Sequence, residues 1–138
     1  MEAKVKYIDG LQFVGEASSG HALLMDGDTA FGGRNTALRP TELLLIGLGG
    51  CSGMDVISLL KKKRQDVRDL EILIKGIKAE SYPQKFTDIA LEFVVTGLNL
   101  SEEAVKRAIY LSMDKYCSVK ATIEGSAKVT FSYRIVEG

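Results

Sequence analysis

Two cysteines are the residues of this sequence with the clearest chemical potential. Cys51 lies in the stretch IGLGGCSGMDV, residues 46–56, where four glycines crowd around it, and Cys117 lies in DKYCSV, residues 114–119. A thiolate is a strong nucleophile, and a cation beside a thiol lowers the thiol pKa and so raises the thiolate fraction at neutral pH. Two thiols in a small chain can form a redox pair, or both can be inert members of a core.

The surroundings of Cys51 in the sequence favour a reactive thiol. The glycines leave unusual room at its sulfur, and the side chain is expected to face the loop that holds Arg34 and Arg39. An arginine in that position would stabilise the thiolate. The two cysteines are 117 − 51 = 66 positions apart, and this spacing does not show whether their sulfurs meet. The alternative of two inert core thiols therefore stays open.

Several other functions lack the residues they need. One histidine and two cysteines give no zinc-ligand spacing, there is no Ser-His-Asp candidate, and GLGGC is not followed by the Lys-Ser or Lys-Thr of a phosphate-binding loop. The 18 basic and 18 acidic residues balance, which argues against nucleic-acid or anionic-membrane partners. The longest apolar run, residues 43–54, is judged too short to span a bilayer, and no signal-peptide layout is present. We expect a cytoplasmic protein without cofactors.

The elements that position the cysteines are predicted to form an α+β fold. Pro40 suits the first position of a long helix, which runs to about Gln65 with Glu42 in its first turn. Ser101 caps a second helix that ends near residue 115, and a glycine-rich loop covers residues 26–39. Alternating patterns and turn residues predict strands at residues 2–8, 11–17, 21–26, 70–82, 86–100 and 122–136. The order βββ-α-ββ-α-β forms a single domain over residues 1–138.

The first half of the long helix is apolar or small on every face, so all of its sides should be covered. One curved sheet in a chain of this size covers only one side. A second copy would cover the other, and Gly47, Gly50 and Gly53 have the small-residue spacing that lets two helix backbones approach. The alternative is a helix enclosed within one domain, with the glycines fitting bulky side chains of the sheet.

The stretch RPTELLLIGLGGCSGMDV, residues 39–56, together with DKYCSV, resembles the osmotically inducible protein C (OsmC) family and the related organic hydroperoxide resistance (Ohr) proteins. The resemblance covers nearly the whole chain, because the order of elements also matches. It implies an intertwined homodimer, with two long central helices back to back. It also implies a thiol peroxidase in which Cys51 attacks the hydroperoxide and Cys117 resolves the sulfenic acid. An external dithiol, such as a lipoyl group, would reduce the disulfide, and no metal, haem or flavin would be needed.

The sequence departs from the most active relatives at two positions. Those relatives carry an arginine in the N-terminal hairpin and a glutamate directly after the helix-starting proline. Here the hairpin has no arginine and Thr41 follows the proline, so Glu42, Arg39 and Arg34 are the expected replacements. The leading hypothesis is reduction of organic hydroperoxides, and also of hydrogen peroxide, in oxidative-stress defence. The alternatives are an OsmC-fold dimer that binds ligands or thiols with little peroxidase activity, and a structural or interaction protein with inert thiols.

Overall fold

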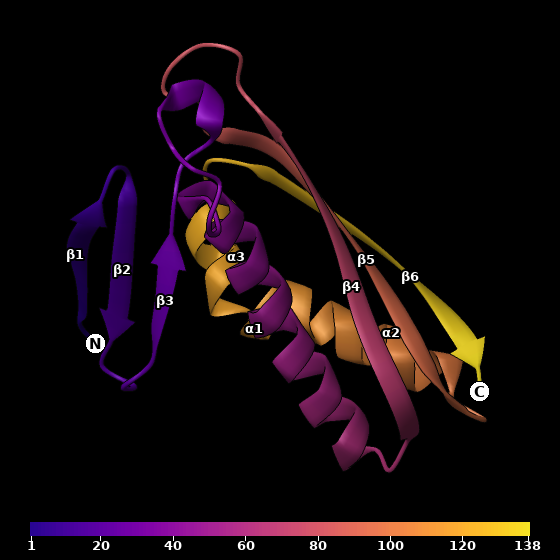
Figure 1. Cartoon of the computed structure of the whole chain (residues 1–138). Coiled ribbons are helices and arrows are strands. Elements are labelled where there is room, and N and C mark those ends of the chain that lie inside the picture. Colours follow the sequence, from indigo (N-terminus) through magenta and orange to yellow (C-terminus); the bar gives the residue numbers. More distant parts are fainter. The chain divides into compact units, whose positions relative to one another are not determined.

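The computed structural model describes all residues, 1–138, and confirms the α+β class (Figure 1). The chain divides into two compact units, Met1–Leu44 and Leu45–Gly138, and the division falls inside the long helix α1 (Pro40–Lys62). The other elements are β1 (Ala3–Asp9), β2 (Gln12–Ala17), β3 (Ala22–Met25), the 3₁₀ turn η1 (Thr29–Phe31), β4 (Asp66–Lys78), β5 (Phe86–Leu98), α2 (Glu102–Leu111), the π-helical turn η2 (Ser112–Tyr116), α3 (Ser118–Ile123) and β6 (Lys128–Glu137).

The first unit is a three-stranded antiparallel sheet in the order β1-β2-β3. Gly10 turns the chain from β1 to β2 with φ at +56°, a left-handed conformation that favours glycine. Every residue of β1 is exposed, including Val5 and Tyr7. The unit therefore presents apolar strand surface without a core of its own, which is uncommon for an isolated sheet.

The loop after β3 is organised by Asp26, whose side chain is buried. Its carboxylate accepts hydrogen bonds from the backbone N–H groups of Gly27, Arg34 and Thr36 and from the Thr36 hydroxyl. The hydroxyl of Thr36, followed by these N–H groups, lowers the pKa of Asp26 to about 2. The aspartate thus stays ionised and ties both ends of the loop to the end of β3.

The second unit packs helices on a three-stranded sheet in the order β4-β5-β6. Strands β4 and β5 form a long antiparallel hairpin, and β6 runs parallel to β5 because α2, η2 and α3 carry the chain back between them. Alternate side chains of β5 point into the core, where they meet side chains of α1 and α2. The fully or almost fully buried members of this core include Leu48, Val56, Leu60, Ile89, Leu91, Phe93, Val95, Val105 and Ile109.

Several predicted boundaries differ from the structure, and four of the differences have a local reason. The long helix ends at Lys62 because Arg64 adopts a left-handed φ of 55°. Strand β4 begins at Asp66, four residues earlier than predicted, because its ladder with β5 continues to that position. Helix α2 ends at residue 111 and the chain continues as the π turn η2. The predicted last strand, residues 122–136, begins only at Lys128, because residues 118–123 form α3.

Helix α1 has one stripe in the core and an opposite stripe that is open in the single chain. Leu48 and Val56 have no exposed surface, whereas 53 % of Ile46 and 76 % of Met54 is exposed. The whole helix of 23 residues is long and apolar enough to cross a membrane by length and composition, although its core run alone is shorter. A core helix meets the same criteria, and one stripe of α1 packs on the sheet of the second unit.

Candidate thiol site

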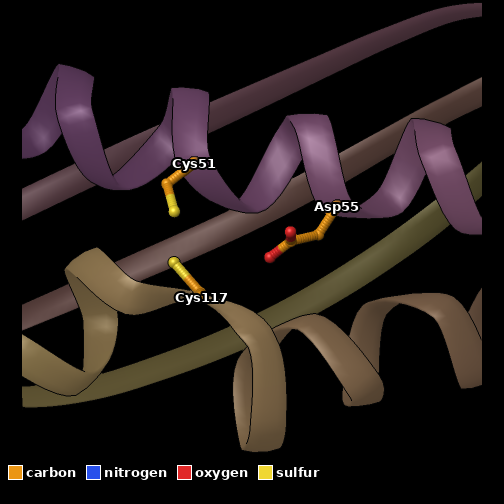
Figure 2. Close-up of side chains that lie close together, drawn as sticks. All are labelled: Cys51, Asp55 and Cys117. Carbon is orange, nitrogen blue, oxygen red and sulfur yellow. The ribbon is translucent and has the colours of Figure 1, made fainter.

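The second unit brings the two cysteines together with an aspartate. Cys51 and Asp55 lie one turn apart on the same face of α1, and Cys117 lies between η2 and α3. The two sulfurs and a carboxylate oxygen of Asp55 all lie within 4.8 Å of one another. Figure 2 shows the two thiols pointing toward each other, with the carboxylate beside them. Both cysteines are free thiols in the structure.

The π turn η2 brings Cys117 to α1. The backbone N–H of Cys117 donates to the carbonyl of Ser112, five residues earlier, at 2.8 Å. Cys117 then leaves the helical conformation, with φ −70° and ψ 102°, and its sulfur accepts a hydrogen bond from the backbone N–H of Lys120 at 3.4 Å. Cys117 therefore ends one helical segment and caps the next. A π turn of this kind often marks a functional site, because it re-aims one side chain within a helix.

The two thiols lie in different environments. Cys51 is partly exposed, whereas only 4 % of Cys117 is accessible to solvent. The pKa of the Cys117 thiol is raised to about 11, chiefly by burial; the Lys120 N–H opposes this rise, and the neighbours Cys51 and Asp55 contribute to it. The pair thus joins the thiol of a partly exposed cysteine to a buried thiol whose raised pKa keeps it protonated at neutral pH.

Asp55 is held in place by Ser112, which the sequence analysis did not single out. The Ser112 hydroxyl lies 2.9 Å from a carboxylate oxygen of Asp55, to which it donates, and 3.4 Å from the carbonyl oxygen of Ser52. Ser112 and Ser52 have no exposed surface. The sequence did carry a signal for Asp55, because residues i and i+4 share a helix face. Nothing in the sequence indicated the hydrogen bond from Ser112, which is 57 positions away.

Arg34 and Arg39 lie in the first unit, and each has an acidic partner there. The Arg34 guanidinium lies 2.8 Å from the carboxylate of Asp9, beside the turn of the β1–β2 hairpin. The Arg39 guanidinium donates to the side chain of Asn35 at 3.0 Å and lies 3.9 Å from the carboxylate of Asp28. The thiols belong to the second unit, so support of Cys51 by either arginine remains a prediction.

Glu42 takes part in the start of α1. Its carboxylate accepts the backbone N–H of Arg39 at 2.7 Å, while the Arg39 carbonyl accepts the N–H groups of Glu42 and Leu43. This is the glutamate half of a capping box, which fixes where a helix begins. Glu42 therefore has a structural partner, and its predicted catalytic part remains untested.

The two thiols and Asp55 could also hold a metal ion. They offer two sulfurs and one oxygen, a donor set that suits zinc and leaves a fourth position for water. The sequence spacing had indicated no such set, because Cys117 comes from a distant part of the chain. A bound ion would occupy the same sulfurs that a disulfide would join.

Residues 33–132 match the family described as OsmC-like protein. The chain belongs to the OsmC-like family. It is 46 % identical to protein YhfA of Escherichia coli K12 over 136 residues, which cover 99 % of this chain and 98 % of YhfA. Family membership confirms the resemblance inferred from the motifs around the two cysteines, and it spans both units of the chain.

The chain is also similar to solved structures. A protein from Aquifex aeolicus VF5 aligns with a TM-score of 0.87 and 33 % identity, over 99 % of this chain and 96 % of its own. A protein from Legionella pneumophila, named an organic hydroperoxide resistance protein OsmC, aligns with a TM-score of 0.71 and 19 % identity, over 96 % of this chain and 94 % of its own. The second likeness shows the OsmC fold alone.

Proposed function

We propose that the protein reduces organic hydroperoxides through Cys51 and Cys117. The observation that carries this proposal is the approach of the sulfurs of a partly exposed and a buried cysteine to within 4.8 Å, with both thiols free. Membership of the OsmC-like family supports it, as does the name of the Legionella relative, an organic hydroperoxide resistance protein. The location that we propose is the cytoplasm, where thiols are kept reduced.

In the proposed reaction the Cys51 thiolate attacks the distal oxygen of the peroxide. The O–O bond breaks, the alcohol leaves, and Cys51 becomes a sulfenic acid. The Cys117 sulfur then attacks the Cys51 sulfur, and water leaves as the disulfide forms. An external dithiol of the lipoyl type reduces the disulfide by exchange and returns both thiols. The buried position of Cys117 keeps it from competing for the peroxide.

We further propose that the working unit is a homodimer joined along α1. A Cβ added to Gly47 or Gly50 would meet no atom within 4 Å, so this chain alone gives no packing reason for either glycine. Gly53 does have a packing reason within its own chain, which the sequence-based hypothesis did not expect: a Cβ added there would lie 3.1 Å from the Ile72 side chain of the same unit. The open stripe of α1 and the exposed β1 strand are apolar surfaces that a second copy would cover.

The direct test is a single turnover. Reduced protein treated with one equivalent of an organic hydroperoxide is expected to lose both thiols and to give one disulfide, Cys51–Cys117, by peptide mapping. Turnover should then continue with a dithiol, and comparison of small and bulky hydroperoxides would identify the preferred substrate. If neither thiol reacts faster than free cysteine, the peroxidase proposal is wrong, and the binding or structural alternative replaces it.

Arg39 is expected to support the Cys51 thiolate more than Arg34 does. The charge of Arg34 is opposed at 2.8 Å by Asp9, whereas the acidic partner of Arg39 is more distant, at 3.9 Å. Arg39→Ala should therefore slow alkylation of Cys51 at neutral pH by about 3- to 10-fold, as expected for loss of one partly screened charge. Arg34→Ala is the matched control, with a change below about 2-fold. The reverse order of the two rates would transfer the role to Arg34.

A further inference from the structure

The proposed reaction leaves open which group accepts the proton of the Cys117 thiol. Cys117 must attack as a thiolate, yet it is buried and its pKa is raised to about 11, chiefly by that burial. Only 4 % of the surface of Cys117 is exposed, so an external base has little access to its sulfur. A group inside the site is therefore needed to accept the proton during the attack.

Asp55 is the base that the site contains. Its carboxylate oxygen lies within 4.8 Å of both sulfurs, which allows transfer directly after a small movement or through one water molecule. The Ser112 hydroxyl donates to this carboxylate at 2.9 Å, and Figure 2 shows the carboxylate directed toward the two sulfurs. The N–H of Lys120 also faces the Cys117 sulfur, but it is a donor and accepts no proton.

We propose that Asp55 accepts the proton of Cys117 as the disulfide forms and delivers it to the leaving group. This inference rests on the roles given above to Cys51 and Cys117. The Cys117 sulfur loses its proton and bonds to the Cys51 sulfur, while the S–O bond of the sulfenic acid breaks. The oxidation state of the Cys117 sulfur rises by one, and that of the Cys51 sulfur falls by one. The proton passes through the carboxylate to the departing hydroxyl, which leaves as water.

The same step can be measured without peroxide. The aromatic disulfide 5,5′-dithiobis(2-nitrobenzoate) is expected to react first with Cys51, releasing one equivalent of coloured thiolate and leaving a mixed disulfide. Cys117 then attacks the Cys51 sulfur and releases a second equivalent, while its proton goes to Asp55 and on to solvent. In Asp55→Asn the second phase should slow by about 100- to 10,000-fold, the usual contribution of a general base. The first phase should keep its wild-type rate within about 3-fold or become faster, because a negative charge near Cys51 is removed.

Three controls separate proton transfer from structure. Asparagine still accepts the Ser112 hydrogen bond, so Asp55→Asn should unfold at the wild-type temperature. Asp55→Glu keeps a carboxylate and should recover part of the second phase, whereas Ser112→Ala keeps Asp55 and should slow that phase by no more than about 10-fold, the cost of one lost hydrogen bond. A second phase unchanged in Asp55→Asn, or equally slow in the Asn and Glu variants, overturns the inference.

This experiment also separates the inference from the proposed function. A wild-type protein that consumes no hydroperoxide, but whose second phase depends on Asp55, would refute the peroxidase while leaving the proton acceptor in place. An active peroxidase whose disulfide forms at the wild-type rate in Asp55→Asn would refute Asp55 as the proton acceptor and leave the proposed function in place.

Discussion

Cys51→Ser is expected to abolish hydroperoxide reduction, with a rate at least about 1,000-fold below that of the wild type, because the attacking group is removed. The remaining thiol cannot replace it. A pKa of about 11 leaves about one Cys117 thiolate in 10⁴ at pH 7, since 11 − 7 = 4. Burial, the main cause of that pKa, persists in the variant. Peroxide consumption in the presence of a dithiol measures the loss.

Cys117→Ser is the matched variant and should behave differently. The protein should still consume one equivalent of hydroperoxide, at close to the wild-type rate, because Cys51 is intact. Without a second thiol the sulfenic acid should persist, then oxidise further to sulfinic acid with excess peroxide, and mass spectrometry distinguishes these states. If Cys51→Ser retains the fast reaction and Cys117→Ser loses it, the roles of the two cysteines are exchanged.

Gly50→Leu is expected to weaken the proposed dimer by at least about 30-fold in Kd. Overpacking a tight contact costs about 1–3 kcal/mol, and a two-fold interface meets the new side chain twice. If the protein were a monomer, the same substitution would instead raise its stability. No atom lies within 4 Å of the added Cβ, and replacing a helical glycine by a better helix former stabilises a helix by about 1 kcal/mol. Sedimentation over a range of concentrations measures the assembly, and denaturation measures the stability.

Gly49→Ala provides the comparison within the same helix. Its added Cβ would lie 2.6 Å from the end of the Ile74 side chain, which must move, so Gly49→Ala should lack the gain of about 1 kcal/mol expected for a helical glycine, and it should leave assembly unchanged because it does not reach the open stripe of α1. A Gly50→Leu protein that remains dimeric, or that is more stable than the wild type and monomeric like it, would show that Gly50 does not serve helix approach.

The sequence by itself determined the α+β class, the long helix and most of the strands, and the family. Local signals sufficed for these: Gly10 at the hairpin turn, Pro40 with Glu42 at the start of α1, and Ser101 at the start of α2. The two cysteine motifs were specific enough to indicate the OsmC family, which the family match confirms. The element boundaries were less well predicted, because pairing between strands decides how far each strand extends.

Only the tertiary structure decided which side chains meet. Cys51 and Cys117 are far apart in the sequence, and their approach depends on the parallel return of the chain to β6 and on the π turn η2. No local pattern predicts that turn, since a π-helical hydrogen bond forms where packing, and not propensity, re-aims a residue. The hydrogen bond from Ser112 to Asp55, and with it the candidate base of the site, likewise arises from packing between α1 and the end of α2.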